Sequence, residues 1–144
     1  MGLISNVEHV LERIRHAERC AQRPQGSVRL IAVTKGQPSE TLRAGYDAGL
    51  REFGENYLSE ALKKMEDLKD LPDLVWHFIG PIQSNKTRLI AEHFDWVHSI
   101  DREKVAIRLN QGRPLELPPL DVCIQVNVRQ RSQEIAGIDA QSGA

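Results

Sequence analysis

The stretch that decides the fold is Val28–Pro38, which reads VRLIAVTKGQP. Its first half is apolar and rich in β-branched residues, and it stops at Gly36 and Pro38, a pattern typical of a strand that is covered on both faces. Lys35 follows this run directly, so we expect it where the strand meets the next loop. In parallel α/β folds the carboxyl ends of the strands are where ligands bind, which makes this a functional position.

Two interpretations of Lys35 are open on these residues alone. A partly desolvated lysine is shifted toward the neutral amine, because burial disfavours the charged form. A neutral amine can attack a carbonyl and form a Schiff base. The alternative is a solvated lysine that only flanks a strand, since lysines are seldom fully buried. The choice between them depends on the rest of the chain.

The composition is that of an ordinary globular protein. The 144 residues fit one domain, and 40% of them are hydrophobic and 27% charged. Because 19 basic side chains face 20 acidic ones, the net charge of −1 gives no electrostatic reason to expect nucleic acid or an anionic membrane as a partner.

The N-terminus and the cysteines point to the cytoplasm. No secretory signal pattern opens the chain, and no stretch approaches the roughly 20 apolar residues of a membrane span. Cys20 and Cys123 each lie in an apolar setting, which predicts small buried side chains with free thiols. Free thiols suit a reducing compartment, so we expect a cytoplasmic protein without a membrane partner.

Apolar periodicity predicts an N-terminal helix and five strands, with a helix or helical turn after each of the first four strands. The helix is expected over about 6–21, and the strands over 28–34, around Phe53, and over 74–79, 95–100 and 120–128. Regular alternation of this kind predicts a parallel sheet with right-handed crossovers. A doubly wound sheet and part of a (β/α)8 barrel both satisfy it.

Polar residues at or near the strands are further site candidates. Asn56 follows the second strand, where its amide can orient a ligand, although it would serve equally as a helix cap. His77 lies inside the third apolar run, which favours a core histidine over a ligand. In the helix after the second strand, Lys63 and Lys64 are placed on the solvent side.

Several well-known site motifs are absent from the sequence. No G-x-G-x-x-G follows a strand, and there is no G-x-x-x-x-G-K-[ST], no metal-ligand spacing and no G-x-S-x-G. These absences leave dinucleotide, P-loop, zinc and serine-hydrolase sites without their residues.

Five words of the sequence, read together, resemble a known family. They are AVTKGQP (Ala32–Pro38), FGENY (Phe53–Tyr57), WHFIGPIQSNK (Trp76–Lys86), EHFDWVHSID (Glu92–Asp101) and VCIQVN (Val122–Asn127). In this order and spacing they closely resemble the pyridoxal phosphate homeostasis proteins, the YggS/PROSC-like family, which is similar to the barrel domain of alanine racemase. The resemblance runs from about Ser5 to Val128.

The resemblance implies a cofactor and residues that bind it. Lys35 matches the lysine that holds pyridoxal 5′-phosphate (PLP) as an internal aldimine, and Asn56 matches an asparagine near the cofactor. His77 falls within the third motif, where it is taken as a cofactor-site candidate without an assigned contact. The implied role is a carrier that takes part in intracellular PLP homeostasis without robust turnover and supplies PLP-dependent apo-enzymes. A racemase-like enzyme, the alternative, would need a second acid/base residue across the ring.

The chain departs from the family pattern after Val128. The family barrel has eight strands and only five are predicted here, so we expect a truncated (β/α)8 barrel: a partial PLP-binding barrel over 1–128 and a divergent, poorly ordered tail over 129–144. The family's phosphate cradle comes from the later strands, which predicts weak binding of PLP or none by this polypeptide alone. A non-functional or partner-dependent fragment is therefore a further alternative.

Overall fold

The computed structural model describes residues 2–128, in which helices alternate with strands. The elements are α1 (Leu3–Cys20), β1 (Ala32–Val33), α2 (Ser39–Asp47), β2 (Glu52–Glu55), α3 (Leu58–Asp67), β3 (Val75–Phe78), the 3-10 turn η1 (Ser84–Lys86), α4 (Thr87–His93), β4 (Trp96–Ile100), α5 (Glu103–Gly112) and β5 (Asp121–Ile124). The tail predicted over 129–144 lies outside the described residues, so the proposed domain boundary stays a prediction.

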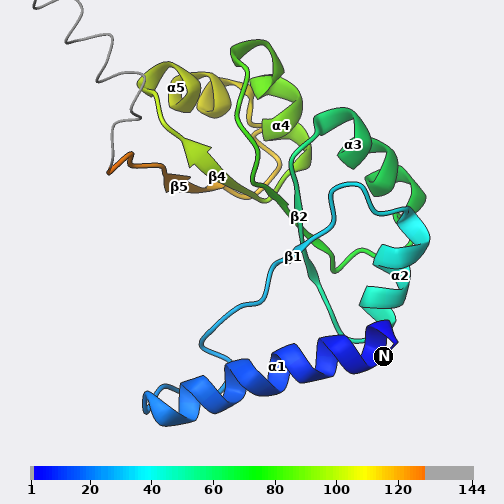
Figure 1. The fold of residues 1–144 in the computed structure, drawn as a ribbon. Coiled ribbons are helices and arrows are strands. Elements are labelled where there is room, and N and C mark those ends of the chain that lie inside the picture. Colours follow the sequence, from blue (N-terminus) through cyan, green and yellow to red (C-terminus); the bar gives the residue numbers. More distant parts are fainter. Residues whose placement is uncertain (1, 129–144) are drawn as a thin grey trace, which may run out of the picture.

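The strands form one parallel sheet in the order β1-β2-β3-β4-β5 (Figure 1). Each strand pairs with the next strand of the sequence, as strands do around a (β/α)8 barrel. A doubly wound sheet would reverse its order at a switch point, and the described sheet has no such reversal. The predicted α/β fold with five parallel strands is confirmed, and of the two open topologies the order is that of the barrel.

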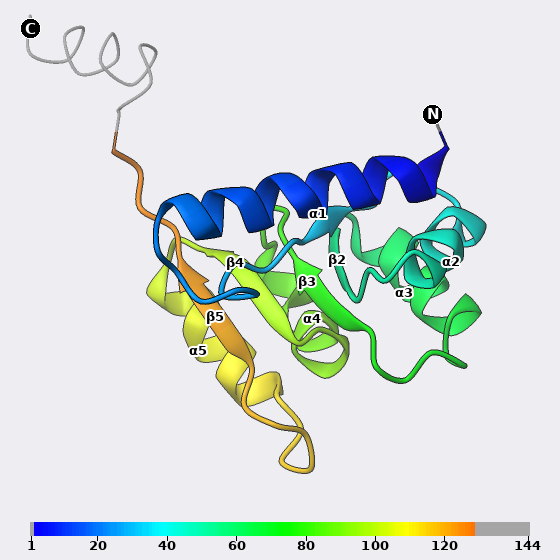
Figure 2. The same ribbon diagram turned by 90° about the horizontal axis from the view of Figure 1, so that it is seen from below.

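Helices cover both faces of the sheet. Figure 2, seen from below, shows α1 lying across the strands, with α3, α4 and α5 behind them. The apolar core fills the space between the strands and these later helices, because the strands turn large side chains toward them. Phe78 meets Phe94 edge to face with ring centroids 5.2 Å apart, and Phe53 lies 5.9 Å from Trp76.

The first strand is shorter than predicted. The apolar run begins at Val28, but β1 pairs with β2 only at Ala32 and Val33, which face Phe53 and Gly54. Within the described residues β1 is an edge strand, and β2 is its only hydrogen-bonding neighbour. No described strand pairs with residues 28–31. The residues before it are held by α1 instead.

Glu18 of α1 fixes the segment that leads into β1. Its side chain is 2% exposed, and its two carboxylate oxygens accept hydrogen bonds from the backbone N–H groups of Gly26 (2.9 Å) and Val28 (2.8 Å). Gly26 adopts a φ of +81°, which glycine reaches without strain. Hydrogen bonds from N–H groups stabilise the ionised form of a carboxyl group, so the N–H groups of Gly26 and Val28 hold the pKa of Glu18 below its ordinary value.

Apolar side chains lie exposed on both edge strands. Val33 of β1 is 54% exposed and Ile124 of β5 is 77% exposed.

The prediction of two buried cysteines is wrong for Cys20, which is exposed in the last turn of α1, and Cys123 is only half-buried in β5. Both are free thiols. Within residues 2–128 no helix has the length and apolar character that crossing a bilayer requires.

The clamp at Glu18 gives a prediction about pH. A carboxyl group with a lowered pKa stabilises the fold above its unfolded-state pKa, and this contribution is lost as pH falls through the lowered value. We expect Glu18→Gln to reduce the urea midpoint at pH 7, because an amide cannot accept from both Gly26 and Val28. The deficit should shrink as pH falls below the ordinary glutamate pKa of 4.5.

The control for this measurement is Glu8→Gln, which changes an exposed carboxylate on the same helix. Urea unfolding of the three proteins between pH 7 and pH 3 makes the comparison. A deficit for Glu18→Gln that is constant across this range would contradict the role given to the ionised carboxylate.

Candidate functional site

The ends of β1 and β2 bring two predicted site residues to one edge of the sheet. Val33 pairs with Gly54, and Lys35 and Asn56 each follow two positions later. Because side chains along a strand alternate between faces, this register places Lys35 and Asn56 at the same level beyond the two strands. The carboxyl edge of a parallel sheet is where ligands bind in such folds.

Lys35 sits in a tight turn directly after β1. The turn is closed by the bond from the Gln37 N–H to the Thr34 carbonyl (3.0 Å), and Gly36 takes a φ of +72°, which favours glycine. Lys35 is exposed, so of the two interpretations left open by the sequence the described structure shows the solvated lysine at a strand end, and the partial desolvation is not found. Its ammonium group is free to reach a ligand, and the structure joins it to no residue among 2–128.

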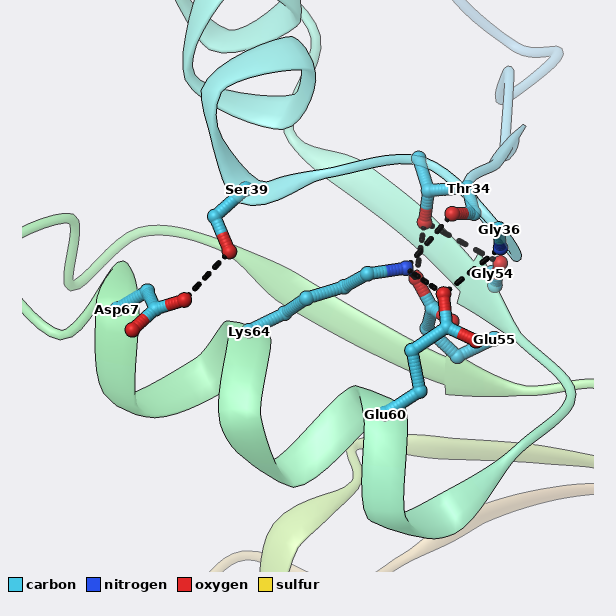
Figure 3. Close-up of polar contacts among 8 residues, drawn as sticks. All are labelled: Thr34, Gly36, Ser39, Gly54, Glu55, Glu60, Lys64 and Asp67. Atoms are coloured by element: carbon cyan, nitrogen blue, oxygen red, sulfur yellow. Dashed lines mark hydrogen bonds and ion pairs between the residues drawn. The ribbon is translucent and has the colours of Figure 1, made fainter.

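A buried lysine stands beside this turn. Figure 3 shows Lys64 extending from α3 toward the end of β1, where its Nζ donates to the Thr34 carbonyl (2.7 Å), to Glu55 Oε1 (2.7 Å) and to Glu60 Oε1 (2.5 Å). Lys64 is 3% exposed and Glu55 is fully buried. The placement of Lys64 on the solvent side of its helix is therefore wrong, because a charged partner on β2 draws it inward.

Thr34 and Glu60 complete the network around the turn. The Thr34 hydroxyl donates to Glu55 Oε1 (2.6 Å), and Glu60 Oε1 also accepts from the Gly36 N–H (2.7 Å). The bond from Lys64, followed by the bond from Gly36, holds the pKa of Glu60 below its ordinary value. Residues before and after Lys35 are thus tied to α3.

Two buried oxygens beside the site have no hydrogen-bond partner among the described residues: Glu55 Oε2 and Asn56 Oδ1. An unpaired buried acceptor is costly, so Asn56 Oδ1 is suited to receive a donor from a ligand, whereas Glu55 Oε2 lies fully buried on the α3 side of the sheet. The alternative role of Asn56 as a helix cap is wrong, because α3 begins after Tyr57 and no side chain caps it. Asn56 is left as a polar group at the strand end.

The chain just after β3 packs directly against Asn56. A Cβ built on Gly80 would lie 2.5 Å from the Asn56 carbonyl oxygen and 2.9 Å from its Cα, so only glycine fits there. The Gly80 carbonyl in turn accepts a short hydrogen bond from the Ser99 hydroxyl. Asn56 is therefore positioned by its neighbours on the sheet and not by its own loop alone.

His77 lies at a lower level of the sheet, away from the carboxyl ends of the strands. It is 1% exposed and pairs with Gly54 in the sheet, which places it two residues, or about 6.6 Å, before the level of Asn56. Its Nδ1 lies 2.9 Å from His98 Nε2, and its Nε2 makes a short contact with Glu52 Oε2. Both ring nitrogens are thus engaged within the sheet, as the core interpretation expected.

Aromatic rings and one guanidinium surround His77. The His77 ring stacks on Trp96 with centroids 5.8 Å apart. The guanidinium carbon of Arg29 lies over the Trp96 ring, 5.8 Å from its centroid. Burial, followed by the charge of His77, lowers the pKa of His98 below its ordinary value. Within residues 2–128 no cluster of three histidine, cysteine or acidic side chains could hold a metal ion.

The arrangement suits a ligand that carries an electrophilic carbon and a hydrogen-bond donor. Lys35 supplies an accessible primary amine, and the Asn56 amide oxygen at the end of the neighbouring strand lacks a partner among the described residues. An aldehyde cofactor such as PLP fits these two groups. Sequence reasoning found both residues but missed Lys64 and Glu60, whose roles depend on contacts between elements.

Curated proteins named pyridoxal phosphate homeostasis protein match most of the chain. The protein of Pseudomonas aeruginosa is 59% identical over 126 residues, which are 88% of this chain and 54% of that protein. The protein of Vibrio cholerae is 49% identical over 139 residues, 94% of this chain and 58% of that protein. For Escherichia coli K12 the identity is 45% over 138 residues, 91% and 58% of the two chains.

A solved structure extends this likeness to the fold. PipY of Synechococcus elongatus PCC7942, solved with PLP bound, is 37% identical with a TM-score of 0.60, over 89% of this chain and 76% of that one. The chain belongs to the pyridoxal phosphate homeostasis protein family. The resemblance stated from the five sequence words is thereby confirmed.

Other comparisons bear on the extent of the likeness. A crystal structure of an unknown protein from Bifidobacterium adolescentis is 33% identical with a TM-score of 0.70, over 75% of this chain and 48% of that one. No family model matches the chain. This member of the pyridoxal phosphate homeostasis protein family spans about half the length of the curated relatives it matches.

The contact between Gly80 and Asn56 gives a second prediction. We expect Gly80→Ala to lower the free energy of unfolding by about 1–3 kcal/mol, because the added methyl group must displace the Asn56 backbone. Gln83→Ala in the same loop, an exposed side chain, should change it by less than about 0.5 kcal/mol. Urea unfolding of both variants makes the measurement, and equal effects would contradict the close packing.

Proposed function

We propose that this chain binds PLP at the carboxyl edge of its sheet and serves intracellular PLP homeostasis as a carrier. The observation that carries the proposal is the position of Lys35, an accessible amine in a fixed turn at the end of β1. The names of the curated relatives and the PLP bound to PipY support it. The cofactor would supply an aldehyde that condenses reversibly with a primary amine.

Three residues have roles in this proposal. Lys35 is the covalent anchor, and Asn56, with its free buried oxygen, accepts a hydrogen bond from the bound cofactor. His77 supports the site from the layer below, because Glu52 and His98 engage both its nitrogens. Lys35 and Asn56 lie at one edge of the described sheet, and the proposal keeps the predicted weak affinity for PLP.

A carrier accounts for the described residues better than a racemase-like enzyme does. The accessible amine can capture and release an aldehyde without any further acid or base. Transfer to PLP-dependent apo-enzymes in the cytoplasm completes the proposed role, and the two free thiols, Cys20 and Cys123, agree with a reducing compartment.

Borohydride trapping tests the anchor. The protein is incubated with PLP and reduced, and the modified lysines are mapped by mass spectrometry. We expect one dominant adduct on Lys35, because its turn presents the amine in a fixed place, and loss of that adduct in Lys35→Ala. Lys63→Ala removes an exposed lysine of α3 and should leave the dominant adduct intact.

Two results would count against the proposal. A label spread evenly over surface lysines would remove Lys35 as the anchor. Turnover of amino acids above the rate of free PLP would favour the enzyme over the carrier.

A further inference from the structure

We infer that Lys64 is a positioning residue, whose buried ammonium fixes the turn that presents Lys35 to its ligand. The inference rests on the proposed function for its consequence, the reactivity of Lys35. Its structural content, a link between α3 and the turn after β1, stands on the contacts alone.

The first step concerns the donors of Lys64. An ammonium group has three N–H donors, and Lys64 Nζ has three acceptors: the Thr34 carbonyl, Glu55 Oε1 and Glu60 Oε1. All donors are thereby used in one geometry, unlike those of a surface lysine, which exchange with water. Its 3% exposure leaves no route by which an aldehyde could reach this amine.

The second step concerns the peptide groups around Lys35. Lys64 holds the carbonyl of Thr34 directly, and it holds Glu60, whose Oε1 accepts from the Gly36 N–H. One ammonium therefore controls the residue before Lys35 and, through one carboxylate, the residue after it. With both neighbours fixed, the direction in which the Lys35 side chain leaves the backbone is fixed as well.

The third step concerns the division of work between the two lysines. Lys64 is buried, paired with two carboxylates and closed to solvent, whereas Lys35 is exposed and joined to no residue among 2–128. A site that holds one lysine and presents the other reacts at a single amine. Correct placement of a reacting group contributes strongly to rate, and a small displacement is costly.

The first measurement needs no cofactor. Hydrogen exchange of the Gly36 amide reports whether the turn is held, since that N–H is bonded to Glu60. We expect exchange to become about tenfold faster in Lys64→Met and in Glu60→Ala. Lys63→Met and Glu66→Ala change exposed residues of the same helix and should leave the exchange unchanged.

A set of variants at Glu60 keeps the test decisive if Lys64→Met, which leaves Glu55 buried without its cation, does not fold. Glu60→Ala removes a partly exposed side chain, and Glu60→Gln keeps an acceptor oxygen for Gly36. We expect the Gly36 amide to exchange as slowly in Glu60→Gln as in the wild-type protein, and faster in Glu60→Ala. Circular dichroism confirms that each variant is folded.

The second measurement is borohydride trapping with PLP in the same variants. We expect the Lys35 adduct to fall about tenfold in Lys64→Met and Glu60→Ala, and to recover in Glu60→Gln. Wild-type exchange rates at Gly36 in Lys64→Met and Glu60→Ala would overturn the inference, as would a loosened turn with undiminished labelling of Lys35. If wild-type protein does not label Lys35, the proposed function fails while the exchange result still decides whether Lys64 holds the turn.

Discussion

The buried ammonium of Lys64 is the constraint on which the arrangement of β1, β2 and α3 depends. Transfer of an ammonium and a carboxylate from water into the protein costs several kcal/mol for each ion and is offset only when the remaining donors are satisfied. Lys64 meets this condition only if the Thr34 carbonyl, Glu55 and Glu60 all converge on it. Any slip of β1 along β2 would leave the charge incompletely paired.

This constraint explains how β1, a strand of two residues, keeps a fixed register against β2. The ladder between β1 and β2 is too short to set the register by itself, and the exposed Val33 contributes little burial. The two ends of the segment are held instead, by the carboxylate of Glu18 before the strand and by Lys64 after it. The two ends of the β1 segment are therefore fixed by charged groups of two helices.

The strand β2 places a carboxylate on each face of the sheet. Its residues alternate, so Glu55 turns to α3 and meets Lys64, whereas Glu52 turns to the other face and meets His77. Each carboxylate has a partner of its own, and the two polar groups are separated by the sheet. Asn56 follows at the end of the strand, where the alternation brings it to the same face as Glu52.

The sequence predicts much of this fold because the main signals are local. Apolar runs that end at Gly36 and Gly80 mark strand ends, and regular alternation implies a parallel sheet. The role of Lys64 was not predictable, because helical periodicity treats every lysine as solvent-facing and cannot show a carboxylate on another element. The sequence left the exposure of Lys35 open for a related reason: burial at a strand end depends on what covers it.

The consecutive strand order has a consequence for how the chain folds. Each strand pairs with one that follows it by about twenty positions, so every loop closure is short and its entropic cost is similar. Non-local pairing slows folding, and here each pairing spans only about one β–α unit of the chain. The β1–β2 ladder and the ion pair between Glu55 and Lys64 all lie within positions 32–64, so these contacts join neighbouring segments of the chain and need no residue of β3, β4 or β5.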